Sequence, residues 1–376
     1  MTDVLYLIRS LNIGGSERQL ITLVSCLHAR GHNVSVVTFY AEGSLLDELR
    51  TAGVPIHNLG KRGRWDLFPV IIRFIRLLRS ERPRILHGYL DPPNIVAVAA
   101  KLLFPPLRVV WGVRGSANDF QHHDWLARLC FRASCSLARF ADLIIINSEC
   151  GLQHHAAHGY PSDRMVVIPN GIDTEMFSPD PEGRTQIRSE WGVRPSDRLV
   201  GYVARLDPIK DHATFLEAAS LLASSVDRIR FVCVGDGPKA YRDELRALAA
   251  HSGLDDLLIW AGFRSDMRSV YNALDIGVSS SLSEGFPNCI GEAMACGVPC
   301  VVTDVGDSAV IVGDRDAVVP RSNPVALAQA VRLSLERMNS YNATALRTKI
   351  VEKFSLERLI QSTEERLGLR CPKGPM

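Results

Sequence analysis

Short apolar runs alternate with longer segments of helical periodicity along most of the chain. Strand-like runs are expected at 3–8, 33–39, 84–87, 108–113, 142–147 and 164–168, and a second series at 199–203, 229–234, 257–260, 275–279 and 299–303. Strands that alternate with helices form parallel sheets. The pattern therefore predicts two α/β domains, with a linker around residues 175–195.

Composition is consistent with a two-domain enzyme: the chain has 376 residues, 46% hydrophobic and 22% charged. No apolar run reaches the roughly 18 residues of a membrane span, and Val4 to Ile8 is too short for a signal peptide. We therefore expect a cytoplasmic chain whose nine cysteines, which form no CxxC pair, are reduced and mostly buried.

The most specific segment runs from Ser283 to Pro299. Gly285 and Pro287 keep Glu284 on a loop, whereas Asn288 is expected to cap a helix that carries Glu292. Free amides at a helix start bind phosphate, and carboxylates accept hydrogen bonds from sugar hydroxyls. The segment therefore predicts a sugar-nucleotide site, the alternative being an ordinary turn with two solvated glutamates.

The spacing E-x7-E, with Gly-Phe-Pro-Asn after Glu284 and Ala-Met-Ala-x-Gly-x-Pro after Glu292, resembles the donor site of family 4 retaining glycosyltransferases. This resemblance implies the α/β fold called GT-B, in which two Rossmann-like parallel-sheet domains face a central cleft. It implies an acceptor-binding domain at 1–175, a donor-binding domain at 195–355, and a C-terminal helix within 356–376 that returns to the first domain.

Further motifs follow in the order of that family. A glycine pair follows the first strand, Arg205 and Lys210 have the family's R-x4-K spacing, and a Gly-Asp-Gly turn begins at Gly235. The resemblance implies catalytic roles for Arg205, Lys210 and Glu284. It implies donor contacts for Gly14, Gly15, Gly235, Phe263, Arg264, Phe286, Pro287, Asn288 and Glu292. Without the family motif, Arg205 and Lys210 would be interpreted as surface charges and the glycines as residues of tight turns.

The chain departs from the family where many relatives have a histidine after the strand that ends near Val110. Here Arg114 stands near that place. A permanent cation cannot act as a base, so Arg114 is expected to bind donor phosphate or acceptor. Asp119, with His122, His123 and Asp124, supplies further acceptor-side candidates.

Charge is uneven: up to Asn170 there are 19 Lys and Arg against 13 Asp and Glu, and the rest of the chain has 24 against 28. The basic excess gathers at 61–84, where Arg73, Arg76 and Arg79 form a stripe beside an apolar band. Two interpretations remain open, namely peripheral contact with the inner face of an anionic membrane and a helix that covers the sheet with a solvated edge.

The resemblance implies transfer of a hexose, with retention, from a nucleoside diphosphate sugar to a hydroxyl of a lipid-linked or cell-surface glycan. A UDP-linked donor is expected, with no cofactor and no nucleic-acid partner. No metal site is expected either, because His154, His155 and His158 lack a suitably spaced acidic residue. In this mechanism Glu284 grips the transferred sugar and Glu292 the ribose. The alternatives are a sugar-nucleotide epimerase of the same architecture and a nucleotide-sugar-binding module without catalysis.

Overall fold

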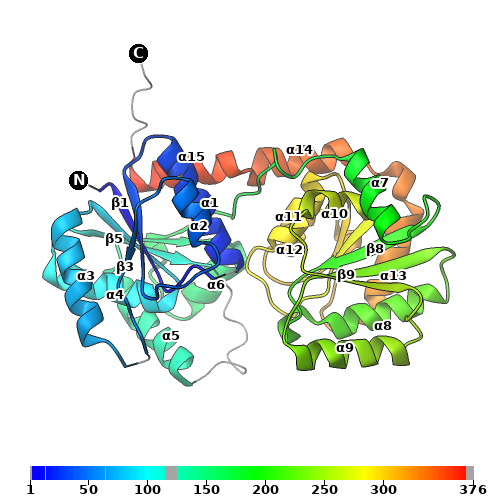
Figure 1. The fold of residues 1–376 in the computed structure, drawn as a ribbon, viewed down its shortest axis with the longest axis horizontal. Helices are drawn as coiled ribbons and strands as arrows, with labels where there is room; N and C mark the ends of the chain where they lie inside the picture. The colour runs from blue at the N-terminus through cyan, green and yellow to red at the C-terminus, as the bar shows by residue number, and fades with distance from the viewer. Residues whose placement is uncertain (1, 13, 64, 115–124, 370–376) are drawn as a thin grey trace, which may run out of the picture. The chain divides into compact units, whose positions relative to one another are not determined.

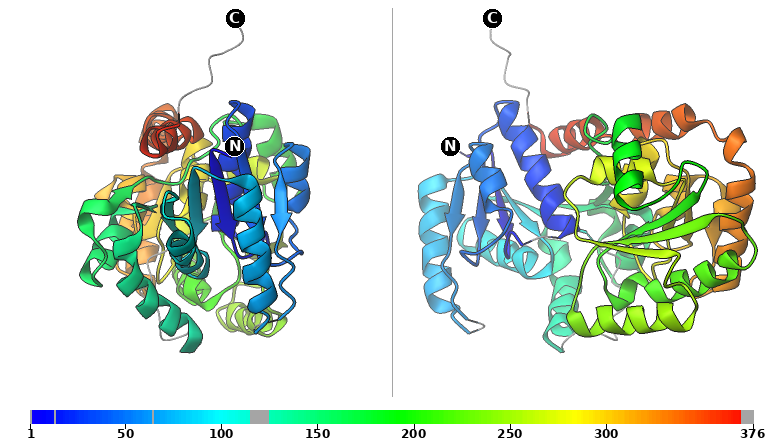
Figure 2. Two further views of the ribbon diagram at one scale, coloured as in Figure 1. Left: turned by 90° about the vertical axis from the view of Figure 1, so that its left-hand side faces the viewer. Right: turned by 45° about the vertical axis from the view of Figure 1, so that its right-hand side comes forward.

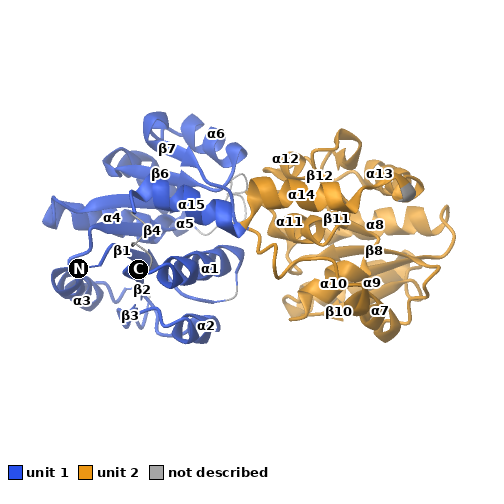
Figure 3. Ribbon diagram, turned by 90° about the horizontal axis from the view of Figure 1, so that it is seen from above, with its two compact units in different colours: residues 1–171, 356–376 blue, residues 172–355 orange. Residues whose placement is uncertain are grey.

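The structure is a computed structural model that describes residues 2–12, 14–63, 65–114 and 125–369. The chain divides into two compact units, coloured separately in Figure 3: unit 1 comprises residues 1–171 and 356–376, and unit 2 comprises residues 172–355. Each unit is a parallel sheet covered by helices on both faces, as Figure 1 shows. The predicted pair of Rossmann-like α/β domains is therefore confirmed.

Unit 1 contains a seven-stranded parallel sheet in the order β3-β2-β1-β4-β5-β6-β7. Strands β1, β2 and β4 are buried along their whole length, as expected of apolar runs covered on both faces. The edge strand β3 was missed in the sequence because three residues show no periodicity. The strands are β1 (Val4–Ile8), β2 (Val34–Thr38), β3 (Ile56–Asn58), β4 (Ile85–Tyr89), β5 (Arg108–Val113), β6 (Leu143–Ile146) and β7 (Met165–Val167).

Two helical layers cover this sheet. On one face, α1 packs beside α15, and Arg30 of α1 pairs with Glu357 and Glu364 of α15. The other face is covered by α3, through Val70, Phe74 and Leu78, and by α4, as Figure 2 also shows. The helices are α1 (Gly15–Ala29), α2 (Leu46–Thr51), α3 (Phe68–Glu81), α4 (Asp91–Leu103), α5 (Trp125–Leu137), α6 (Glu149–Ala157) and α15 (Leu356–Leu367).

Unit 2 contains a six-stranded parallel sheet in the order β10-β9-β8-β11-β12-β13. The two-residue strand β13 was not predicted, because its Val-Val pair is too short for periodicity. The strands are β8 (Arg198–Val203), β9 (Ile229–Val234), β10 (Leu258–Gly262), β11 (Ile276–Ser279), β12 (Cys300–Thr303) and β13 (Val318–Val319).

Helices α8, α9 and α13 form one layer on this sheet, and α7, α10, α11 and α14 lie on the other side. The segment expected as a linker contains α7, whose Arg184 and Arg188 bind Asp275. The helices are α7 (Pro181–Glu190), α8 (His212–Ala223), α9 (Lys239–His251), α10 (Met267–Ala273), α11 (Asn288–Ala295), α12 (Ser308–Val312), α13 (Pro324–Glu336) and α14 (Ala343–Phe354).

In both sheets the strand order reverses once, between β1 and β4 in unit 1 and between β8 and β11 in unit 2. Open parallel sheets bind ligands at the carboxyl ends of the strands beside such a reversal. The loops there carry Gly14 and Gly15 after β1, Arg205 and Lys210 after β8, and Glu284 after β11. Within the described part of the chain, every helix is too short or too polar to cross a bilayer.

Candidate active site

The loop after β8 carries the two predicted catalytic cations. Asp207 organises it, since one carboxylate oxygen accepts from the Ile209 amide at 3.1 Å and the other from the Arg205 guanidinium at 2.8 Å. A single helical turn, Pro208–Lys210, then leads into α8. Arg205 has a side chain 65% exposed, so its guanidinium is accessible to a ligand, whereas Lys210 turns into unit 2.

Lys210 and Glu284 form a largely buried ion pair across the strand reversal, with the ammonium 2.5 Å from Oε1 of Glu284. Ser281 donates to the same oxygen at 2.7 Å, and Tyr202 donates to the Lys210 carbonyl at 2.7 Å. Burial is the largest single influence on the pKa of Lys210 and would lower it, but the charge of Glu284, its hydrogen bond and the charge of Cys289 together raise the pKa above its ordinary value. The lysine is therefore a cation at neutral pH.

The Glu284 loop is fixed by its neighbours. The Leu282 amide donates to the Ile209 carbonyl at 2.8 Å, and the Asp307 amide donates to the Gly285 carbonyl at 2.9 Å. Gly306 has a φ of +55°, and a Cβ there would lie 2.4 Å from the Glu284 carbonyl oxygen, so only glycine allows this approach. The loops that follow β8 and β12 thus hold the Glu284 loop, which follows β11, in place.

Helix α11 carries Glu292, whose carboxylate accepts a 2.6 Å hydrogen bond from the Tyr271 hydroxyl. The prediction that Asn288 caps this helix was wrong by one residue: Pro287 is the N-cap and Asn288 is already helical. Because Pro287 has no side-chain acceptor, the N-cap residue itself gives no side-chain hydrogen bond to the first amides. One of the amides at the start of this helix, that of Ile290, donates to the Pro287 carbonyl at 3.2 Å.

The remaining donor candidates of unit 2 differ in their surroundings. Gly235 has a φ of +139°, and a Cβ there would lie 2.0 Å from the Ala204 carbonyl oxygen. Phe263 is 63% exposed. Arg264 pairs with Glu190 and Asp266, which gives it a structural role. The ring of Phe286 is buried against Phe354, 5.4 Å between centroids, and so belongs to the core.

Unit 1 carries the remaining predicted residues. Gly14 is the N-cap of α1 in an extended conformation, and Gly15 is the first helical residue. Arg114 follows β5 and is buried, with its guanidinium 4.8 Å from the centre of the Tyr89 ring and 3.2 Å from Oδ1 of Asn170. Asp119, His122, His123 and Asp124 lie outside the described residues.

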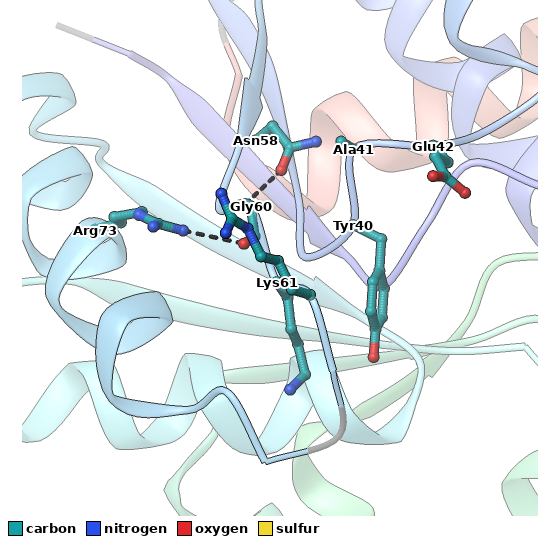
Figure 4. Close-up of a pocket in the computed structure, with 8 residues that line it drawn as sticks. Tyr40, Ala41, Glu42, Asn58, Gly60, Lys61 and Arg73 are labelled. Carbon is teal, nitrogen blue, oxygen red and sulfur yellow. Dashed lines mark hydrogen bonds between the residues drawn. The ribbon is translucent and has the colours of Figure 1, made fainter.

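A recess of about 670 Å³ opens beside the carboxyl ends of β2 and β3 (Figure 4). One wall is fixed by Arg73, which donates to the Leu59 and Gly60 carbonyls at 2.6 and 3.1 Å. Three of its residues belong to the basic segment predicted from the sequence. The recess is lined by Tyr40, Ala41, Glu42, Asn58, Gly60, Lys61, Arg62 and Arg73.

The His154 ring lies edge-on to that of His155 and tilted against that of His158, with centroids 5.3 Å and 4.4 Å apart. Within the described ranges, no three His, Cys, Asp or Glu side chains are grouped as metal ligands. Independence from metal stays a prediction.

Sequence reasoning missed Tyr202, Tyr271 and Ser281, which hold the predicted residues in place. Tyr202 interrupts an otherwise apolar strand, and a buried phenol needs a hydrogen-bond partner. This need for a partner is the signal in the sequence that could have pointed to a hydrogen bond of the tyrosine.

Two family models match this chain, one in each half. The family model described as Glycosyltransferase Family 4 matches residues 13–176, and the one described as Glycosyl transferases group 1 matches residues 197–337. The UDP-Gal:alpha-D-GlcNAc-diphosphoundecaprenol alpha-1,3-galactosyltransferase of Escherichia coli is 26% identical over 308 residues, which cover 78% of each chain.

Several solved structures have the same fold as this chain. HepE of Anabaena in complex with UDP has a TM-score of 0.87 at 22% identity, over 98% of this chain and 100% of that one. WaaG, a glycosyltransferase involved in lipopolysaccharide biosynthesis, has a TM-score of 0.74 at 18% identity, over 98% and 100% of the two chains. These likenesses identify the fold as GT-B. With both halves of the chain matched by family models, the protein belongs to the family 4 glycosyltransferases.

Proposed function

We propose that this glycosyltransferase moves a hexose from a UDP-linked sugar to a hydroxyl of a lipid-linked or growing cell-surface glycan, with retention of the α configuration and without a metal. The observation that carries the proposal is the group around Arg205, Lys210 and Glu284 at the strand reversal of unit 2. Relatives support the substrate classes: HepE is solved with UDP-glucose, and the Escherichia coli relative uses a UDP-sugar and a diphosphoundecaprenol acceptor.

In this mechanism Arg205 and Lys210 neutralise the diphosphate as it leaves. Charge-assisted contacts aimed at developing charge are among the largest contributions to catalysis. Glu284 accepts hydrogen bonds from hydroxyls of the transferred sugar, and Glu292, oriented by Tyr271, accepts them from the ribose. The departing diphosphate takes the acceptor proton on the same face of the sugar, so no base is needed on the opposite face. Gly14 and Gly15 remain predicted donor contacts through their amides.

The deciding experiment is a screen of UDP-sugars by release of UDP, with membrane lipid extract as the source of acceptor, followed by NMR of the product linkage. An α linkage from an α donor supports the proposal, and a β linkage contradicts the retaining mechanism. Interconversion of the sugar with donor alone would indicate an epimerase. Binding of UDP-sugar without turnover for any acceptor fraction would indicate a non-catalytic module.

Peripheral contact with the inner face of an anionic membrane is part of the proposal. Trp65, Leu67, Phe68 and Ile71, at the start of α3, are exposed, and Trp65 and Phe68 are 75% and 74% exposed. A group of large apolar side chains beside basic residues is typical of helices that lie on anionic bilayers. Arg76 and Arg79 on the outer side of α3 supply the basic charge.

A further inference from the structure

Arg114 is a buried cation that has no carboxylate partner among the described residues. The residue Arg114 is only 8% exposed. Among the described residues, no Asp or Glu oxygen lies within 4.0 Å of its guanidinium, and its one hydrogen bond goes to the neutral side chain of Asn170. By contrast, the equally buried Arg188 of unit 2 is paired with Asp275 at 3.2 Å.

The described tyrosine and histidine side chains around Arg114 carry no negative charge. It lies over the Tyr89 ring, and burial raises the pKa of Tyr89 and of the nearby Tyr6, so both phenols stay neutral. Burial, reinforced by Arg114, lowers the pKa of His87 to about 3, so this imidazole is also neutral. Glu17 raises the pKa of Tyr89 through its charge but forms no ion pair with Arg114. Within the described part of the chain, the cation therefore has no ion-pair partner.

The same neighbourhood holds several polar atoms without partners. The hydroxyls of Tyr6 and Tyr89, both ring nitrogens of His87, and Nε of Arg114 are buried and accept or donate no hydrogen bond. Buried water can satisfy the neutral groups, but water does not neutralise a charge. A buried, unpaired guanidinium is costly, and a site that keeps one is suited to an anion that arrives with the substrate.

We infer that Arg114 binds an oxyanion carried by the acceptor substrate, a phosphate or a carboxylate group. This inference rests on the proposed function, because it assumes that unit 1 binds the acceptor. Arg114 follows β5 at the carboxyl edge of the unit 1 sheet, where parallel sheets bind ligands. In the proposed mechanism the donor phosphates already bind Arg205 and Lys210 of unit 2. The acceptor is then the source of the anion for Arg114.

Titration of the full chain with inorganic phosphate, with UDP present at saturation to fill the donor site, tests the inference. We expect phosphate to bind the UDP-loaded protein and to raise its melting temperature relative to chloride of equal ionic strength. In Arg114→Gln the dissociation constant should rise by about tenfold or more, and Arg114→Lys should keep part of the affinity as a point charge. Arg108→Gln, at the opposite end of the same strand, should bind phosphate as the wild type does.

Three results would overturn the inference: no phosphate binding by the wild type, phosphate binding abolished by UDP, or equal binding in wild type and Arg114→Gln. The second would assign the anion to the donor. Because Arg114→Gln removes an uncompensated buried charge, it should melt at or above the wild-type temperature without phosphate. Phosphate binding requires no sugar transfer, so failure of the proposed function and failure of this inference are observed separately.

Discussion

The ammonium of Lys210 lies 2.5 Å from Oε1 of Glu284, although the two residues are 74 positions apart in the chain. Without substrate, the cation predicted to bind diphosphate and the carboxylate predicted to bind sugar neutralise each other. In the proposed mechanism the donor phosphate binds Lys210 and the sugar hydroxyls bind Glu284, so a substrate group replaces each partner of the ion pair.

Replacement of Arg205 or Lys210 by Ala should lower turnover. Each charge-assisted contact is worth about 1.5–3 kcal/mol, which corresponds to a loss of on the order of tenfold to a hundredfold. Initial rates of UDP release measure this. Lys239→Ala, which removes an exposed lysine paired with Asp243, is the control and should keep the wild-type rate. Wild-type turnover in both single variants would remove the cations from the site.

Tyr271→Phe should weaken donor binding more than turnover. The change removes one hydroxyl, which donates to Glu292 at 2.6 Å, and preserves the buried ring. Because hydrogen bonds to charged groups are worth about 1.5–3 kcal/mol, the KM for donor should rise on the order of tenfold. Glu292→Gln should act in the same direction. An unchanged KM with a reduced kcat in both variants would contradict the proposed ribose contact.

Asp275→Ala should destabilise unit 2. Asp275 binds Arg184 at 2.7 Å, Arg188 at 3.2 Å and the Leu199 amide at 2.7 Å, and loss of the carboxylate leaves Arg188 buried and unpaired. Breaking a buried ion pair costs about 3–5 kcal/mol of unfolding free energy. Urea unfolding followed by circular dichroism measures the cost. Asp243→Ala breaks an exposed pair and should unfold as the wild type does.

Stability should fall as the pH decreases below 6.5. Burial lowers the pKa of His87 to about 3 and those of His155 and His212 to about 4, so these rings are neutral in the folded protein while the unfolded chain takes up protons near pH 6.5. Their contribution is complete above pH 6.5 and is lost as the pH falls through the folded pKa values. For His212 it amounts to roughly 3 kcal/mol.

Urea midpoints between pH 7 and 5 test this dependence, since few carboxylates titrate there. His212→Phe should flatten the slope, because a phenyl ring preserves the stack on Tyr202 without taking up a proton. A slope identical to the wild type would show that His212 is not neutral in the folded state.

Replacement of Trp65 and Phe68 together by Ser should weaken sedimentation with anionic vesicles by about tenfold or more, because each exposed ring contributes about 1.5–3 kcal/mol when buried. Arg76→Gln with Arg79→Gln should weaken it through charge, by roughly 1 kcal/mol per residue at low salt. Val310→Ser, which changes an exposed apolar residue of unit 2, is the control. Equal recovery of all variants on neutral and anionic vesicles would favour a helix that only covers the sheet.

Local patterns predicted most of the fold, because β1, β8 and their neighbours are apolar runs long enough to show periodicity. They failed at β3 and β13, which are too short, and at α7, whose polar sequence resembled a linker. Motif spacing predicted which residues follow the reversal strands. It could not predict the Tyr271–Glu292 bond, because such contacts depend on packing between distant segments.

Gly235 and Gly306 set limits on any attempt to change donor choice by directed evolution. At both positions a methyl group would collide with a carbonyl oxygen, of Ala204 in one case and of Glu284 in the other. Libraries that randomise these glycines would mostly yield variants with displaced loops. Phe263, a predicted donor contact, is exposed, so diversity placed there should leave the framework intact.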